Sequence, residues 1–495
     1  MSMSEQFDRR SRRAFLAQSS LGFGLGGLAL TSLLHRDRIA RADADPAWTL
    51  PDGKPHFPPR VKNVIWLFMI GGTSHVESFD PKPALVRYAG KSIAETPYAG
   101  AVTNPLSKNV RVIVADQANG HMRQIIYPLQ VGYRKRGESG IEMSDWWPCL
   151  SGCADDLAVV RSMWTTDNDH GAQLQFHTGR HALEGPFPTI GSWVHYGLGS
   201  LNDDLPAFVV LGNPIADCCG GLGGHGANYL GPEHDGVQLA VDPKNPLPFA
   251  SPGGDVYREE QEGESALLGR LNRLSAVEHP EDQALQARIK SYELAFRMQT
   301  AVPEVMRFGQ EPRSTASLYG LDRDASRPFG EICLTARRLV ERGVRFVQIF
   351  HGSNGGAGAW DAHGGLRQNH ATMCAQVDQP IAGLLKDLKR RGLLDETLVV
   401  WATEFGRTPG AQGGDGRDHH PFGFSIWMAG GGVKGGTVHG ATDELGFHAV
   451  EDRHYVTDVH ATVFQQLGLD PRRLEVPNHK RLEIDHGRPI SAILA

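Results

Sequence analysis

Residues 401–421, WATEFGRTPGAQGGDGRDHHP, combine the end of an expected strand with residue types that bind metals. The apolar run at 398–402 predicts a buried β-strand, and Glu404 follows it closely. A glycine-rich loop is then expected, leading to His419 and His420. Open α/β sheets bind ligands at the carboxyl ends of their strands, and carboxylates and imidazoles are common ligands of borderline divalent metals. The stretch therefore predicts a metal site at a sheet edge, with an ordinary polar surface loop as the alternative.

The remaining chain predicts the sheet to which this strand belongs. Apolar runs of strand length occur at residues 63–70, 157–163, 205–211, 344–350, 397–402 and 424–429. Helical patterns occur at residues 172–177, 262–308, 332–342, 372–391 and 458–467. We assign 262–308 a structural role, because its apolar residues recur at helical spacing. Alternation of strands and helices predicts a doubly wound, mainly parallel α/β sheet flanked by helices, in a single domain over 61–495.

Polar residues follow four of these strands, which end near residues 70, 163, 350 and 402. Parallel strands release their loops at one edge of the sheet, so the groups are expected to converge on one cleft. The candidate metal ligands, sufficient for one or two divalent ions, are Asp361, His363, Glu404, His419, His420 and Asp80. The candidates for completing the site, handling protons or binding an anion are His75, Asp169, His170, Arg180 and Arg407. For each residue taken singly, the alternative is a satisfied surface or core position.

The segment after the first expected strand allows two interpretations. Residues 74–77, SHVE, could contribute polar groups to the cleft. They also fit a capping box that begins a helix, with Ser74 and Glu77 as its two members. The sequence leaves both open.

The N-terminus resembles an export signal. Residues 8–16, DRRSRRAFL, contain a twin-arginine motif, and a weakly apolar run follows at 21–34. Residues 40–42, ARA, form a cleavage site, so 1–42 are expected to be a signal peptide and 43–60 a proline-rich tether. The apolar run is too short and glycine-rich for a stable membrane span. We therefore expect the twin-arginine translocase as a partner and a periplasmic or secreted protein.

Composition narrows the class of protein. The chain has 495 residues, 40% of them hydrophobic and 21% charged, which is typical of a globular protein. The net charge of −6, with no basic tract beyond the N-terminus, argues against nucleic acid as a partner. The six cysteines match no zinc-ribbon spacing. Cys149 and Cys153 are one helical turn apart and could form a disulfide or stay as buried thiols, and the adjacent Cys218 and Cys219 receive no interpretation.

Several motifs resemble one family. They are GGTSHVESFDPKP at 71–83, DHGAQLQFHTGRH at 169–181, GSWVHYGLGS at 191–200, LPAFVVL at 205–211, ARRLVERGVRFVQIFHG at 336–352, WDAHGG at 360–365, TEFGRTP at 403–409, GRDHHPFGFSIWMAGGGVKGG at 416–436 and TDVHATVFQQLGLDP at 457–471. Together they resemble the DUF1501 family of exported, sulfatase-like proteins in the alkaline phosphatase superfamily. The resemblance extends from about residue 60 to 475. It implies an alkaline phosphatase-like fold more directly than it implies an activity.

The resemblance also implies roles for individual residues. In WDAHGG, Asp361 and His363 match an Asp and a His that bind metal in the superfamily. Glu404 takes the place of the Asp in the superfamily's Asp-His-Gly segment, and Arg407 follows where a His is expected. His419 or His420 resembles the late His ligand. The segment 177–180, HTGR, resembles the Thr-Gly-Arg that follows the sulfatase nucleophile.

Departures from the superfamily pattern concern the nucleophile. Sulfatases carry Cys-x-Pro/Ala-x-Arg, whereas the nearest string here, CLTAR at 333–337, lacks the central residue and lies in an expected helix. Asp169 and His170 stand at the nucleophile position, which should hold Ser, Thr or Cys. The Asp that should follow the first strand is missing, and Asp80 comes later. Formylglycine chemistry is therefore not expected.

These observations lead to three hypotheses. The first is an exported, metal-dependent hydrolase of a sulfate or phosphate ester on a small molecule or polysaccharide, in which water activated by the ion attacks directly. Zinc is the preferred ion, with manganese, magnesium and calcium as alternatives. The second is a catalytically degenerate, sulfatase-like envelope scaffold or glycan-binding protein. The third is a protein that binds metal only for stability.

Overall fold

The strand β1 (Asn63–Met69) lies inside the central sheet, and all seven of its residues are buried. A run without polar interruption is expected for a strand covered on both faces. β1 pairs in parallel with β7 (Phe346–His351) on one side and with β8 (Thr397–Ala402) on the other. In this computed structural model the described residues are 51–111, 123–242, 244–245, 257–278, 283–476, 479 and 487–495, all within one compact unit, residues 51–495.

The central sheet has nine strands in the order β12-β4-β11-β8-β1-β7-β5-β6, and β15 also pairs with β4. The other strands of this sheet are β4 (Leu157–Trp164), β5 (Phe208–Leu211), β6 (Val237–Leu239), β11 (Phe424–Gly430), β12 (Thr437–His439) and β15 (His454–Tyr455). Every pairing is parallel except those of β11 with β4 and β8. The fold is therefore mixed α/β with a mainly parallel sheet, as the sequence predicts.

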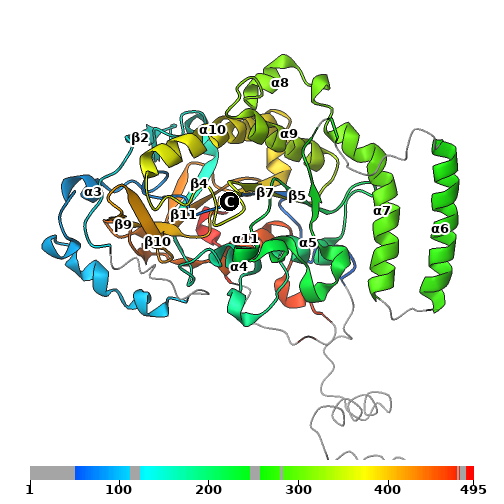
Figure 1. The fold of residues 1–495 in the computed structure, drawn as a ribbon, viewed down its shortest axis with the longest axis horizontal. Coiled ribbons are helices and arrows are strands. Elements are labelled where there is room, and N and C mark those ends of the chain that lie inside the picture. Colours follow the sequence, from blue (N-terminus) through cyan, green and yellow to red (C-terminus); the bar gives the residue numbers. More distant parts are fainter. Residues whose placement is uncertain are drawn as a thin grey trace, which may run out of the picture. The chain divides into compact units, whose positions relative to one another are not determined.

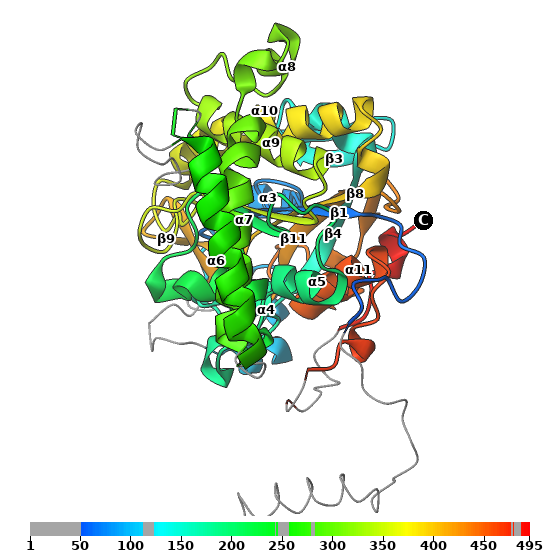
Figure 2. The same ribbon diagram turned by 90° about the vertical axis from the view of Figure 1, so that its right-hand side faces the viewer.

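Helices cover both faces of this sheet, as Figures 1 and 2 show. Alternate side chains of β1 enter two cores, with Leu67 in one and Trp66 in the other. The first core includes helices α7 (Gln283–Val305), α9 (Arg327–Glu341) and α10 (Leu366–Arg390). The second includes α4 (Ala172–Thr178), α5 (Ile190–Leu198) and α11 (Val456–Gln466). The two faces are thus packed independently.

The remaining elements lie around this framework. The helices are α3 (Pro83–Arg87), α6 (Arg258–Glu278) and α8 (Arg313–Leu318). The strands form three two-stranded sheets: β2 (Tyr133–Arg136) with β3 (Ile141–Ser144), β9 (Gly406–Gln412) with β10 (Gly416–His420), and β13 (Ala441–Thr442) with β14 (Ala449–Glu451). α6 and α7 form a helix pair at one side (Figure 1). Of the described residues, none belongs to a helix long and apolar enough to cross a membrane.

Some elements differ from the sequence-based predictions. The glycine-rich segment after β8 is a β-hairpin, β9 and β10, because its backbone groups pair across the turn between Gln412 and Gly416. The 424–429 run forms a strand, but an antiparallel one. Ser74 and Glu77 hydrogen-bond to each other without starting a helix, so the capping-box interpretation is wrong. The signal-peptide prediction lies outside the described residues.

Part of the expected tether lies within the described residues and contacts the rest of the protein. Of residues 43–60, the described part begins at 51, and the backbone N–H groups of His56 and Phe57 donate to Gly468 O.

All six cysteines are free thiols in the structure, including Cys149 and Cys153. The backbone N–H groups of Cys149 and Leu150 both donate to the carboxylate of Asp378 on α10, which ties this turn to the helix.

Candidate metal centre

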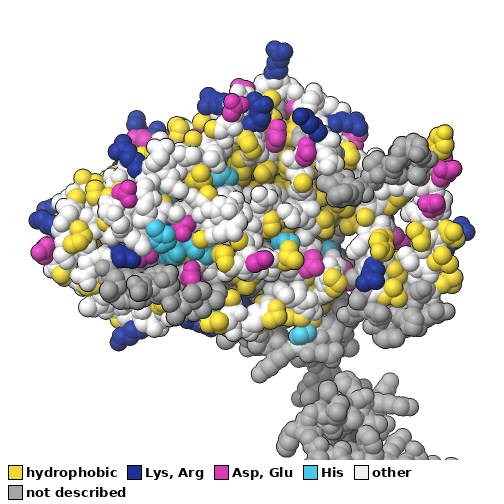
Figure 3. Space-filling view, viewed as in Figure 1, with side chains coloured by type: hydrophobic (Ala, Val, Ile, Leu, Met, Phe, Trp, Pro, Cys, Tyr) yellow, Lys and Arg dark blue, Asp and Glu magenta, His cyan; other side chains and the backbone are white. Residues whose placement is uncertain are grey.

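Four segments meet at the carboxyl edge of the sheet. His170 lies between β4 and α4, and Asp361 and His363 lie in the loop after β7. Glu404 follows β8, and His419 is in the hairpin strand β10. The common edge follows from the parallel arrangement of β4, β7 and β8. Histidine and acidic side chains are seen together on the face of the molecule drawn in Figure 3.

The carboxylate of Asp361 is at the centre of this cluster. Its Oδ1 lies 3.0 Å from His363 Nε2 and 3.1 Å from His419 Nε2. Its Oδ2 lies 3.3 Å from His170 Nε2. Arg407 Nη2 donates to Oδ1 over 2.7 Å. Burial alone would raise the pKa of Asp361, but Arg407 and the three imidazoles outweigh it and hold the pKa well below its usual range. The group is therefore a carboxylate at any physiological pH.

Each of the three imidazoles is held by a hydrogen bond from its other nitrogen. His170 Nδ1 lies 3.1 Å from Glu404 Oε1. His419 Nδ1 lies 2.8 Å from the backbone oxygen of Asn168, and His363 Nδ1 hydrogen-bonds to Gln412 Oε1. Each Nδ1 thus faces an acceptor to which it can donate a proton, although His170 Nδ1 also lies 3.3 Å from the amide nitrogen Gln173 Nε2. Each Nε2 is directed at Asp361. This is the arrangement by which metal-binding histidines are oriented in proteins.

The protonation states differ between the three rings. Burial lowers the pKa of His419 to about 3, so this ring is neutral and its Nε2 presents a lone pair. Burial also opposes the charge on His170, but hydrogen bonds to Asp361 and Glu404 raise its pKa to about 9. The pKa of His363 is raised despite its burial, chiefly by the hydrogen bond to Asp361. The two Nε2 atoms of His363 and His419 are 2.9 Å apart, so they share at most one proton.

This donor set fits a divalent cation. A lone pair of His419 faces both a carboxylate oxygen and a second imidazole nitrogen, an arrangement that a bound cation stabilises. Two groups of three residues each have ligand atoms that all lie within 4.8 Å of one another. One group is Asp361, His363 and His419, and the other is Asp169, His170 and His419. The groups share His419, so the cluster has donors for one or two ions, and imidazole-rich donor sets favour zinc over magnesium or calcium.

Glu404 and Arg407 support the cluster from inside the protein. Glu404 is fully buried and accepts hydrogen bonds from the backbone N–H of Gly71 and from Gln173 Nε2. Arg407 donates from Nε to Gly72 O, from Nη1 to Arg417 O and from Nη2 to Gly71 O and Asp361. Its guanidinium is thus held by protein acceptors and positions Asp361, rather than reaching out as an anion-binding group.

Glycine is required where β1 ends, because backbone and side chains crowd there. Gly71 has φ 123° and Gly72 has φ 76°, both in the region that favours glycine. A Cβ at Gly71 would lie 2.5 Å from the backbone nitrogen of Asp361, and a Cβ at Gly72 would overlap the ring of Phe405. These two glycines let Glu404, Arg407 and Asp361 approach one another closely.

The structure places four other candidates outside the cluster. Asp80 pairs with Lys82 over 3.0 Å and accepts a hydrogen bond from Thr442 Oγ1. His75 is buried, its Nε2 lies 2.7 Å from Gly446 O, and burial lowers its pKa. His420 packs on Phe447 with ring centroids 4.1 Å apart, since consecutive strand residues point to opposite faces. Arg180 pairs with Glu184 over 2.9 Å and lies over the Phe187 ring.

Sequence reasoning did not identify several residues that orient the cluster. Gln173, one helical turn after His170, donates from Nε2 to Ala357 O and Glu404. Gln412 and the backbone of Asn168 hold two of the imidazoles. His370 on α10 accepts from the backbone N–H of Ser74 and so secures the β1 loop. Of these, only Gln173 had a sequence signal, its i+3 spacing from His170.

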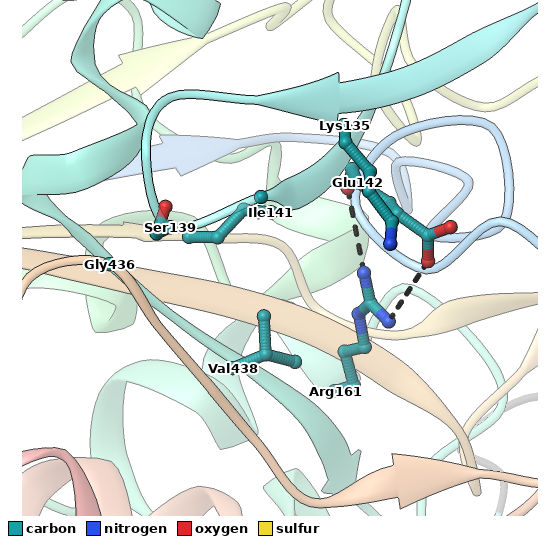
Figure 4. Close-up of a pocket in the computed structure, with 8 residues that line it drawn as sticks. Lys135, Ser139, Ile141, Glu142, Arg161, Gly436 and Val438 are labelled. Atoms are coloured by element: carbon teal, nitrogen blue, oxygen red, sulfur yellow. Dashed lines mark hydrogen bonds and ion pairs between the residues drawn. The ribbon is translucent and has the colours of Figure 1, made fainter.

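Two pockets lie near the sheet. A cavity of about 660 Å³ opens at the carboxyl ends of β5 and β7, the same edge as the cluster. Its polar lining includes Asn213, Gln238, Asp324, Glu331 and Gln376, and none of its lining residues is Lys or Arg. A smaller one of about 350 Å³ lies beside the β2–β3 hairpin, and its Arg161 is already paired with Glu142 at 3.9 Å (Figure 4). That pocket contains no predicted site residue.

Comparisons with known proteins give one family and several distant structures. No curated protein matches the chain. It is similar to the PsFucS1 sulfatase from Pseudoalteromonas sp. (12% identity, 83% of this chain, 68% of that chain, TM-score 0.33). It is also similar to the phosphonate monoester hydrolase SpPMH from Silicibacter pomeroyi (13% identity, 70% of this chain, 71% of that chain, TM-score 0.33). A third similar structure is the C-terminal periplasmic domain of EcEptC from Escherichia coli in complex with Zn (9% identity, 88% of this chain, 92% of that chain, TM-score 0.32).

The family assignment rests on a match to nearly the whole of the compact unit. The model of DUF1501, described as a protein of unknown function, matches residues 61–494. The chain belongs to the DUF1501 family.

Proposed function

We propose that this protein is an exported, metal-dependent hydrolase of a sulfate or phosphate ester. The observation that supports it most is the convergence of three Nε2 atoms, from His170, His363 and His419, on the carboxylate of Asp361. A purely structural network would not need three imidazoles that are each anchored through Nδ1. The resemblance of the motifs to sulfatase-like proteins supports the same class of reaction.

Asp361, His363 and His419 would hold one ion, preferably zinc, and His170 with Asp169 would extend the site to a second. When bound, such an ion lowers the pKa of water and neutralises charge on a tetrahedral anion. Glu404 accepts a hydrogen bond from His170 Nδ1 and so keeps Nε2 directed into the site. Arg407 fixes the Asp361 carboxylate, so neither group must reorganise during the reaction.

If the cluster holds a single ion on Asp361, His363 and His419, proton transfer would fall to the carboxylate of Asp169 beside it. Asp169 is only partly buried, and its side chain lies within 4.8 Å of the ligand nitrogens of His170 and His419. A carboxylate in that position is suited to take a proton from the attacking water. His363, with 34% of its side chain exposed, is the most accessible imidazole of the cluster and would face the ester group.

The cavity at the carboxyl ends of β5 and β7 would hold a sugar as part of the substrate. Amide and carboxylate side chains such as Asn213 and Gln238 match the hydrogen-bonding needs of hydroxyl groups, and Phe329 adds an apolar surface. The absence of Lys and Arg from its lining disfavours binding of the sulfate or phosphate there. We therefore propose that the anionic ester binds at the metal cluster and that a neutral part of a glycan or small molecule occupies the cavity.

Export is proposed from the N-terminal sequence. Residues 1–42 would direct the chain to the twin-arginine translocase, and cleavage would leave a mature protein that begins near Asp43. N-terminal sequencing of the protein recovered from the periplasm or medium tests this directly. Recovery of the chain only from the cytoplasm, with residues 1–42 intact, would refute the export proposal.

The hydrolase proposal is tested by metal content and turnover together. Mature protein is loaded in turn with zinc, manganese, magnesium or calcium and assayed on aryl sulfates, phosphomonoesters and phosphodiesters. We expect zinc to copurify and at least one ester to be hydrolysed. His363→Ala and His419→Ala should each reduce bound metal and turnover at least about a hundredfold, on the scale seen for lost ligands and orienting groups. Exposed His479→Ala is the matched control and should behave as wild type.

A catalytically degenerate, glycan-binding scaffold is the second candidate, and one observation favours it. Arg180 and Arg407, expected to bind the anion, both have acidic partners within the protein, Glu184 and Asp361. In that case the zinc-loaded protein hydrolyses no ester in the panel and yet binds sulfated oligosaccharides in a titration. That result would support the glycan-binding function and refute the hydrolase proposal.

A further inference from the structure

The outer edge of the central sheet is built from two short strands placed end to end. β12 pairs with residues 158–160 of β4, and β15 pairs with residues 163 and 164 of the same strand. His439 is the last residue of β12 and His454 is the first residue of β15. Their partners on β4 are Val160 and Met163. The two imidazoles therefore lie at the gap where the edge strand is interrupted.

Across this gap the two rings face each other through their Nε2 atoms. The Nε2 atoms of His439 and His454 are 2.9 Å apart, and the ring centroids are 5.1 Å apart. Both residues are only partly buried, and 16% of the His454 side chain is exposed. An ion from solvent could therefore reach the two nitrogens.

A carboxylate on α11 orients one of these rings. His454 Nδ1 lies 2.9 Å from Asp458 Oδ2, and Asp458 Oδ1 accepts the backbone N–H of Arg488. Since the carboxylate is an acceptor, Nδ1 carries the proton of a neutral His454 and Nε2 presents its lone pair to His439. A carboxylate behind a histidine is the usual way of orienting a metal-binding imidazole.

We propose that His439 and His454 form a second metal site, for a borderline cation such as zinc, at the edge of the sheet. Two nitrogens bound to one tetrahedral zinc lie roughly 3.3 Å apart when each Zn–N bond is about 2.0–2.1 Å. The observed 2.9 Å needs an opening of only a few tenths of an ångström.

The site shares no residue with the cluster around Asp361, so it does not depend on the proposed hydrolase activity. The remaining ligands would be water molecules, and the charge of Asp452, in the turn before β15, would add to the attraction for a cation. Asp452 has φ 42°, so this turn holds a non-glycine residue in the left-handed region. A cation bound here would join β12 to β15 and thereby hold the sheet edge to α11.

Zinc-soaked crystals of the mature protein locate the site independently of activity. Anomalous difference maps at the zinc edge should show a peak within bonding distance of both Nε2 atoms, separate from any peak at Asp361. In solution, equilibrium dialysis should show that His439→Gln and His454→Gln each bind one zinc equivalent fewer than wild type. Asp458→Asn should weaken that equivalent about tenfold or more. His479→Ala, an exposed single imidazole, is the control.

Thermal unfolding gives a second readout. Wild-type protein should gain thermal stability with added zinc, and His454→Gln should lose part of that gain. The proposal is refuted if zinc-soaked crystals show density at Asp361 and none between His439 and His454. It is equally refuted if folded His439→Gln and His454→Gln proteins, judged by circular dichroism, retain every zinc equivalent of wild type.

Discussion

His419 presents an unprotonated Nε2 to the Oδ1 of Asp361 at 3.1 Å, because its Nδ1 proton is donated to the backbone oxygen of Asn168. A lone pair and a carboxylate oxygen repel each other at this distance unless a cation or a proton lies between them. Arg407 supplies part of that positive charge, and His170, whose pKa is raised to about 9, adds to it. A divalent cation between the two atoms would remove the repulsion that remains between His419 Nε2 and Asp361 Oδ1.

Asp361→Asn should separate the roles of this carboxylate in stability and in metal binding. The change leaves the fully buried guanidinium of Arg407 without its acidic partner, which should cost about 3 kcal/mol in the free energy of unfolding. Bound zinc should fall as well, because the central ligand is lost. Urea denaturation and metal analysis measure both effects. Asp156→Asn, which removes an exposed pair with Lys389, should change neither by much.

Glu77→Gln should be among the most destabilising single changes outside the metal centre. Glu77 and Arg417 are both fully buried, and their Oε1 and Nη2 atoms are 2.7 Å apart. Loss of the carboxylate should cost about 3–5 kcal/mol, because the Arg417 charge stays buried without a counter-charge. The matched control is Glu396→Gln, which breaks the exposed pair with Lys62 and should cost at most about 1 kcal/mol. Equal losses in the two variants would contradict this reasoning.

Acid should destabilise the fold through buried neutral histidines. Burial lowers the pKa of His177 to about 3 and that of His460 to about 4, from the ordinary value of 6.5. The unfolded chain therefore binds protons below pH 6.5 that the folded chain does not. Their stabilising contribution is complete above pH 6.5 and declines as the pH falls toward 4, by at most about 1.4 kcal/mol per pH unit for each ring.

His177→Gln tests this pH dependence at one position. His177 Nδ1 donates to Gln173 O over 2.7 Å, and a glutamine amide can replace that donor. Urea denaturation between pH 7.5 and pH 4.5 should give a shallower loss of stability for the variant than for wild type. Parallel curves for the two proteins would show that His177 does not carry the effect.

Gly416→Ala should disturb the candidate metal centre through the backbone alone. A Cβ at Gly416 would overlap the carbonyl group of His363, and backbone atoms cannot yield as a flexible side chain can. We expect weaker zinc binding together with a loss of about 2 kcal/mol or more in unfolding free energy. Gly309→Ala has open space around the added methyl group and serves as the control for the substitution itself.

Particular elements show what could be predicted from the sequence. The runs that became β1, β8 and β4 were placed within one residue of their observed bounds, because an uninterrupted apolar run of that length has few other solutions. The expected convergence of Asp361, His363, Glu404 and His419 follows from parallel strands that end at one edge. Their proposed metal-binding role still awaits the metal analysis.

Other features could not be read from local patterns. The β9–β10 hairpin lies in a segment whose glycines indicated a loop, and its strands are stabilised by pairing with each other and by burial. Arg407 was expected to bind an anion, but its donors are taken by Gly71, Gly72, Arg417 and Asp361. Most of the acceptors that bind the Arg407 guanidinium are distant from it in sequence. A local sequence pattern therefore could not predict that its donors would be occupied.

The sequence by itself determined the class of fold, the family and the residue types available at the sheet edge, because apolar periodicity and motif order are local properties of the chain. Only the tertiary structure decided which of those residues meet. His419 faces Asp361, while the adjacent His420 packs on Phe447, since successive strand residues point to opposite faces. His439 and His454 came together only because two separate strands extend the same neighbour, β4.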